Sequence, residues 1–216
     1  LTKFDPTEYR HSRLIGRQDE LNLANLILTR ADQNCVLLVG DSGIGKTTLI
    51  HYLANLIRMN QCDEFLKNKR ILVLDLGSII SQATSEGKDV ENELNLYFQE
   101  AAFAGNVILV IQNIENFLGA DTGMFRPDVS VVMNEYVQLP TFQVFATSTN
   151  KEYHQLVEKH ENFMKYFEVI EMKEPTEEET IQIMLNNFKE YEDHRVLFTY
   201  DALKRIVSSS EKYRWG

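Results

Sequence analysis

A glycine-rich loop places the strongest constraint on this chain of 216 residues. Residues 40–47 read Gly-Asp-Ser-Gly-Ile-Gly-Lys-Thr, after an apolar run at 35–39 and before helically spaced apolar residues at 47–59. They fit the pattern G-x-x-x-x-G-K-[ST] between a buried strand and a helix, which is that of a phosphate-binding loop. Its glycines let backbone N–H groups face phosphate oxygens, and the helix N-terminus adds a favourable dipole. The loop predicts that the chain binds a nucleoside triphosphate with Mg²⁺.

Individual residues of this loop have expected roles. Lys46 should reach the β- and γ-phosphates, and the Thr47 hydroxyl should contact Mg²⁺. The other residues expected to line the phosphate site are Asp41, Ser42, Gly43, Ile44, Gly45 and Thr48.

Short apolar runs alternate with helical patterns along most of the chain. Five runs are expected to be strands, at 35–39, 70–76, 106–111, 142–149 and 167–172. Helices are expected before, between and after them, at 17–30, 47–59, 88–104, 151–159, 177–190 and 200–209. Because most of the strands are apolar throughout, they predict a parallel five-stranded sheet covered by helices on both faces, an α/β fold of the αβα type. The last two helices have no further strand to pair with and indicate a small helical subdomain.

Two segments have weaker or purely local signals. Residues 119–139 are the hardest to interpret, and their glycines and Pro127 favour a loop before a short helix. The acidic run at 174–180 contains Thr176 followed by Glu179, which is the pattern of a capping box at a helix start. This local role explains the run without invoking a binding site.

Charge and composition exclude several classes of function. The formal net charge of −10 argues against tight, nonspecific nucleic-acid binding, which depends on Lys and Arg neutralising phosphates. No apolar run approaches the roughly 18–20 residues that span a bilayer, so no membrane association is expected. Residues 1–13 lack the apolar segment of a secretory signal. Two cysteines form no disulfide framework or metal motif, and Cys35 is expected in the core, so a cytoplasmic location is predicted.

Beyond single motifs, the order of segments resembles the first ATPase module of Clp-type AAA+ unfoldases and disaggregases. The segments that carry the resemblance are LIGRQDEL, GDSGIGKTTLI, ILVLDLGSII, GNVILVIQNIENFLGA, FATSTNKEYHQLVEKH and FEVIEMKEPTEEETIQIML. The resemblance implies an AAA+ P-loop NTPase with a large domain at 1–175 and part of a helical lid at 176–216, as a fragment of a longer protein. It also implies ATP or ADP with Mg²⁺ as ligands, and self-association into a hexameric ring that acts on an unidentified protein.

The resemblance also suggests where the nucleotide base would bind. The family holds adenine partly through backbone beside the "IGR" segment, which implies that Leu14, Ile15 and Gly16 line the base pocket. The alternative is that these residues only form a turn into the first helix.

The chain departs from the family at the Walker B motif, which ends in Asp-Glu. Gln112 and Asn113 stand at the matching positions. In the family the Asp orients Mg²⁺ and the Glu activates water, whereas a neutral amide cannot accept a proton at pH 7. General-base catalysis contributes about 10²–10⁴ in rate. Asp75 also follows an apolar run but is expected to be structural, while Glu115 is a possible substitute base if the strand continues past Asn113.

Three further positions complete the comparison with the family. The arginine pair supplied in trans is matched by Lys165 and Tyr166, which retain a charge but not the planar guanidinium fork. The tyrosine of the pore loop is matched by Ser85, in a segment between Gly77 and Gly87 that is expected to be a loop. Thr147 matches the sensor residue at a strand end, although a hydroxyl there is also ordinary strand chemistry.

Taken together, an intact phosphate loop and altered catalytic positions favour one hypothesis over two others. The favoured one is an ATP-binding, hydrolysis-impaired module with an assembly or regulatory role. The second is an active protein-remodelling motor with a relocated base such as Glu115. The third is an interaction scaffold with a vestigial nucleotide site.

Overall fold

Among the residues that the structure describes, six strands form one sheet, in the order β1-β3-β4-β5-β2-β6. The computed structural model describes residues 2–3, 14–119, 128–192 and 198–213. Five strands are mutually parallel, namely β2 (Cys35–Val39), β3 (Arg70–Val73), β4 (Val107–Ile111), β5 (Gln143–Ser148) and β6 (Phe167–Glu171). They confirm the expected parallel five-stranded sheet. The sixth, β1 (Thr2–Lys3), pairs antiparallel with β3 and was not expected, because two residues give no periodic signal.

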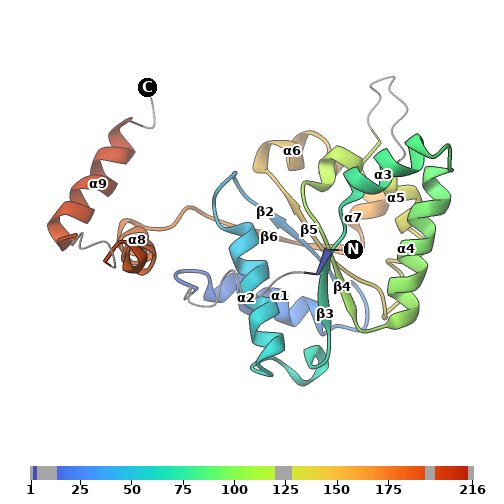
Figure 1. Cartoon of the computed structure of the whole chain (residues 1–216), viewed down its shortest axis with the longest axis horizontal. Helices are drawn as coiled ribbons and strands as arrows, with labels where there is room; N and C mark the ends of the chain where they lie inside the picture. The colour runs from blue at the N-terminus through green and yellow to red at the C-terminus, as the bar shows by residue number, and fades with distance from the viewer. Residues whose placement is uncertain (1, 4–13, 120–127, 193–197, 214–216) are drawn as a thin grey trace.

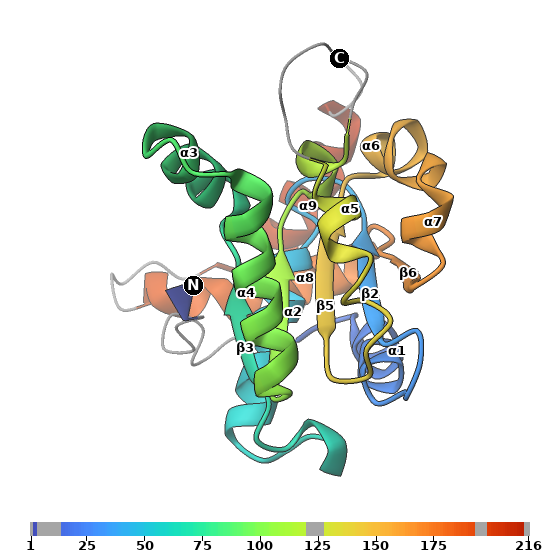
Figure 2. The ribbon, with the colours of Figure 1, turned by 90° about the vertical axis from the view of Figure 1, so that its right-hand side faces the viewer.

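The sheet is the middle of three layers. Alternate residues of β2 face opposite sides, with Cys35, Leu37 and Val39 in one core cluster and Val36 and Leu38 in another. On the first side lie α4 (Val90–Ala104), α5 (Val129–Met133) and α7 (Glu161–Met164), and on the second α1 (Gln18–Leu28) and α2 (Lys46–Arg58). Figures 1 and 2 show α4 and α5 covering one face. Strands β2, β4 and β5 are buried along their whole length, which explains their uninterrupted apolar sequences.

Cys35 is a core residue, as expected. Its side chain is fully buried, and this burial raises the pKa of the thiol to about 12. The two cysteines form no disulfide with each other.

One helix was not predicted. The segment after β3, expected to be a loop between Gly77 and Gly87, is instead the helix α3 (Leu76–Ser85). Asp75 begins it, because its carboxylate accepts hydrogen bonds from the Ser78 backbone N–H at 3.0 Å and from the Ser78 hydroxyl at 2.7 Å. These bonds hold the pKa of the Asp75 carboxyl below its usual range. Asp75 therefore has the structural role that was expected of it.

The remaining elements follow the predicted order with local breaks. The helix expected at 151–159 is divided at Leu156 into α6 (Asn150–Gln155) and the 3-10 turn η3 (Val157–Lys159). Another 3-10 turn, η1 (Glu64–Leu66), precedes β3. The short helix expected within 119–139 is α5, whereas residues 120–127 of the predicted loop lie outside the described residues.

Two helices follow β6, as predicted. They are α8 (Glu177–Glu192) and α9 (Tyr200–Tyr213), which share a small core of Ile181, Leu203 and Val207. Figure 1 shows them beside the three-layered part. The capping box is confirmed, since the Thr176 backbone N–H donates to Glu179 Oε2 at 2.8 Å and the Glu179 N–H donates to Thr176 Oγ1 at 3.3 Å.

Candidate functional site

The carboxyl ends of β2, β4 and β5 meet at one edge of the sheet. Strand β2 lies between β5 and β6, although β3 follows it in the chain. In open parallel sheets, ligands bind at such a switch in strand order, outside the carboxyl ends of the strands. The glycine loop leaves β2 here, and its first residue, Gly40, donates its N–H to the Ser148 carbonyl at the end of β5, at 3.2 Å.

Three glycines shape this loop in different ways. Gly43 and Gly45 have φ angles of +82° and +104°, and a Cβ at either position would meet no atom within 4 Å. Gly40 is packed tightly instead, because a Cβ there would lie 3.1 Å from Ile44 and Met172. Gly45 precedes α2 without a side-chain cap, so the N–H groups of the first turn remain available as donors. This open loop at a helix start fits the phosphates of a nucleotide.

Lys46 is held at the mouth of the loop. Its ammonium donates to the Asp41 carbonyl at 3.0 Å and to the Gly40 carbonyl. Partial burial lowers the pKa of Lys46, and the carboxylates of Glu115 and Asp41 oppose that change. The Asp41 carboxylate in turn accepts a hydrogen bond from Asn150, at 3.1 Å, which ties the loop to α6. Thr47, the expected contact of Mg²⁺, is exposed at the second position of α2.

The segment proposed to line the base pocket lies beside the phosphate loop. Leu14 and Ile15 are half-buried, and Gly16 has a φ of +65°. The sequence interpretation missed Arg17, which is buried at 7% exposure. Its guanidinium donates to Glu20 at 3.0 Å and to the Ile44 carbonyl at 3.4 Å, joining this segment to the loop. The signal available in the sequence was the spacing of Arg17 and Glu20, which are three residues apart at a helix start and can pair there.

A side chain at Gly16 should destabilise the fold. Its φ of +65° disfavours an L side chain, and the Glu179 carboxylate would also have to move away from a Cβ at this position. We expect Gly16→Ala to lower the free energy of unfolding by about 1–2 kcal/mol, measured by denaturant titration. Gly77→Ala is the matched control, since a Cβ there meets Asp75 Oδ1 at an ordinary 3.5 Å inside α3. Equal stability of the two variants would contradict the prediction.

The end of β4 places two amides at the site. Gln112 and Asn113 are exposed, and Asn113 has a φ of +51° with its N–H donating to Thr147 Oγ1 at 3.1 Å. The chain then forms the 3-10 turn η2 (Ile114–Phe117). The strand therefore does not continue past Asn113, which was the condition for Glu115 to share a strand face with Asn113, because β4 ends at Ile111.

The 3-10 turn nevertheless carries Glu115 inward. Its side chain is 8% exposed, and its Oε2 has no hydrogen-bond partner within the described residues. Burial raises the pKa of the Glu115 carboxyl, while the nearby Ser148 hydroxyl and the Lys46 ammonium oppose the rise. Ser148 is the strand-end hydroxyl beside Glu115, whereas the Thr147 hydroxyl holds the Asn113 backbone. Thr147 and Ser148 are adjacent in a strand and so face opposite sides of the sheet. The sequence alone does not tell which of the two faces Glu115.

Other predicted positions lie away from the loop. Lys165 is exposed at the end of α7, with its ammonium 4.7 Å from the centre of the Tyr166 ring. Ser85 is the exposed last residue of α3, and its hydroxyl donates to the Gln82 carbonyl at 2.8 Å.

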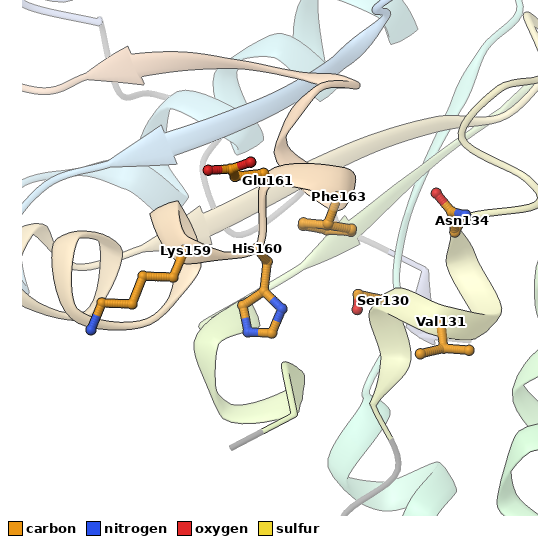
Figure 3. Close-up of a pocket in the computed structure, with 7 residues that line it drawn as sticks. All are labelled: Ser130, Val131, Asn134, Lys159, His160, Glu161 and Phe163. Atoms are coloured by element: carbon orange, nitrogen blue, oxygen red, sulfur yellow. The ribbon is translucent and has the colours of Figure 1, made fainter. Parts of the chain in front are cut away.

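A groove of about 460 Å³ lies between α5 and the η3–α7 segment. Figure 3 shows Ser130 and Val131 on one side of it and His160 on the other, so the groove is distinct from the phosphate loop.

The model of the family described as "ATPase family associated with various cellular activities (AAA)" matches residues 36–159, more than half of the chain. The chain belongs to the AAA family of ATPases. It is a Clp-type AAA+ module. Over 201 residues it is 32% identical to the chaperone protein ClpB of Oceanobacillus iheyensis and 31% identical to ClpC/MecB, the negative regulator of genetic competence of Bacillus subtilis. Each alignment covers 93% of this chain and 25% of the relative, so the chain spans about a quarter of their length.

Solved structures agree with this assignment. Hsp104 of Saccharomyces cerevisiae in complex with casein superposes with a TM-score of 0.82 at 25% identity, over 96% of this chain and 35% of that chain. The Hsp104–ADP complex gives a TM-score of 0.80 at 25% identity, over 98% and 37%. The parallel sheet and its helices are thus the AAA+ fold.

Two features are absent from the described residues. None of the helices is long and apolar enough to cross a bilayer. Within the same part of the chain, no three His, Cys, Asp or Glu side chains gather where they could hold a metal ion.

Proposed function

We propose that this chain is an ATP-binding Clp-type module with impaired hydrolysis, which has an assembly or regulatory role in a ring-forming, protein-remodelling ATPase. The observation that carries the proposal is the combination of an open phosphate loop with two amides, Gln112 and Asn113, at the exposed end of β4.

The residues around the loop fit a nucleotide with Mg²⁺. The N–H groups of residues 41–48 and the Lys46 ammonium would hold the phosphates, and the Thr47 hydroxyl would contact the metal. Leu14, Ile15 and Gly16 would line the base pocket. Mg²⁺ would be bound together with the nucleotide phosphates.

Hydrolysis would be impaired for two reasons. An amide at residue 113 cannot take a proton from water. The exposed Lys165 offers a charge to a neighbouring subunit's site but lacks the bidentate geometry of arginine. Arginine fingers contribute about 10³–10⁵ in rate in GTPases, although such losses do not simply multiply.

The assembly role rests on the family and on the division of the chain. We place the large domain at residues 1–175 and the partial lid at 176–216, since α8 and α9 have a core of their own. By analogy with Clp-type rings, the protein that contains this module would form a hexamer, in the cytoplasm. The Hsp104 match is a complex with casein, which favours a protein partner over a nucleic acid.

The test is to measure nucleotide binding and phosphate release in one preparation. Calorimetry should show binding of ATP or ADP in the presence of Mg²⁺. Phosphate release at saturating ATP should stay at least about a hundredfold below the roughly 1 s⁻¹ that marks the low end for ordinary enzymes. Turnover near 1 s⁻¹ would support an active motor instead. Absence of binding would favour a scaffold with a vestigial site.

A further inference from the structure

We propose that the nucleotide site retains slow hydrolysis and that Glu115, from outside the Walker B positions, is its general base. The inference rests on the proposed function only in requiring that ATP binds at the phosphate loop. Glu115 would be a catalytic residue, because it would contact the attacking water.

The first support is the burial of a carboxylate oxygen that has no hydrogen-bond partner among the described residues. Glu115 is 8% exposed, and its Oε2 accepts no hydrogen bond from the described residues. Burying such an oxygen is costly unless a donor reaches it, so unpaired groups in folded proteins often mark functional sites. A water molecule is the donor that the proposed chemistry would supply.

The second support is the position of Glu115 relative to Lys46. The two side chains stabilise each other's charged forms, yet Lys46 gives its hydrogen bonds to the Gly40 and Asp41 carbonyls. The ammonium and the carboxylate thus attract each other without forming an ion pair. Since a phosphate-loop lysine binds the γ-phosphate, a carboxylate near enough to Lys46 to interact with its charge would lie near the γ-phosphate and the attacking water.

The third support is how the backbone delivers Glu115. Asn113 adopts a left-handed conformation, and its N–H is fixed by Thr147 at the end of β5. The chain turns there, and η2 directs Glu115 toward Ser148 while Gln112 and Asn113 remain exposed. The strand end of this chain carries two amides where the family has carboxylates, and Glu115 from the following turn would take over the role of the base.

The proposed step is balanced without another reactant. The water oxygen forms a bond to the γ-phosphorus as one of its protons passes to the Glu115 carboxylate. The bond between the γ-phosphorus and the bridging oxygen breaks, and the bridging oxygen leaves with its electron pair on ADP. Inorganic phosphate departs, and Glu115 returns its proton to solvent. A pKa raised by burial makes Glu115 a stronger base than an exposed carboxylate.

The test is Glu115→Gln in the protein that contains the module, with Lys46→Ala as the blank. We expect wild-type phosphate release to be slow but above the blank. Glu115→Gln should reduce it by about 10²-fold or to the level of the blank, with ATP affinity retained. Glu158→Gln, an exposed substitution of the same kind in η3, should leave the rate unchanged.

A second comparison tells whether Glu115→Gln lowers the rate by removing the base or by disturbing the fold. In an Asn113→Glu background, which restores a base at the family position, Glu115→Gln should no longer lower the rate. Wild-type turnover equal to the blank would overturn the proposal, as would a Glu115→Gln variant that keeps the wild-type rate. Loss of ATP binding by the wild-type protein would instead refute the proposed function, so the two failures are distinguishable.

Discussion

Asn113→Glu is expected to accelerate phosphate release by at least about tenfold, since a positioned general base contributes about 10²–10⁴ in rate. The residue stands at the exposed end of β4, where the family match places the base. Asn113→Gln is the matched control, because it has the same length as Glu but cannot accept the proton. Phosphate release at saturating Mg-ATP measures both variants.

The backbone conformation at residue 113 should make this substitution destabilising. Asn113 has a φ of +51°, a conformation that asparagine tolerates better than glutamate, so both variants should lose some stability. Comparing Glu with Gln at the same position cancels this loss. Adding Gln112→Asp should raise the rate further by orienting the metal and its water. If neither carboxylate raises the rate, the missing guanidinium at Lys165 is the stronger candidate for the limiting defect.

Lys46→Ala is expected to weaken ATP binding by at least about 2 kcal/mol, or roughly 30-fold in Kd. The ammonium is partly buried at the loop mouth, where its bonds to the Gly40 and Asp41 carbonyls would be replaced by bonds to phosphate. A truncated side chain would leave the phosphate charge without its nearest cation. Calorimetric titration with ATP and with ADP measures the effect.

The control removes a lysine that has no role in the loop. Lys88→Ala deletes an exposed ammonium paired with Glu86 at 2.7 Å, so ATP affinity should not change. The two variants have the same change in net charge, which separates local contact from long-range attraction. A Lys46→Ala variant that binds ATP as tightly as the wild type would mean that the nucleotide lies elsewhere.

The sequence predicted the bounds of an element correctly where burial and a functional loop both constrain the same residues. The strand at 35–39 has its predicted bounds, because a central parallel strand must be apolar on both faces and the glycine loop fixes its end. The prediction failed at α3, where the resemblance to the family's pore loop implied a loop, while the Asp75 cap and the buried Ala83 support a helix.

Parts of the candidate site could not be predicted from the sequence because they depend on the local path of the backbone. No periodic signal reveals that Asn113 turns the chain out of the strand, so the inward path of Glu115 could not be predicted. The choice between Thr147 and Ser148 as the residue beside Glu115 depends on which strand face meets the loop. The contact of Arg17 with the Ile44 carbonyl could not be predicted, because the two residues are 27 positions apart and meet only after folding.

The capping box at the start of α8 is one end of the connection between the sheet and the proposed lid. All its hydrogen bonds join Thr176 to Glu179, so it belongs to the helix and makes no bond to the sheet. On the other side, the Met172 N–H is fixed to the Val39 carbonyl at 2.8 Å. Residues 173–175 connect these two anchors. Any movement of the proposed lid relative to the sheet would therefore act on this short connection and on the contact between Glu179 and Gly16.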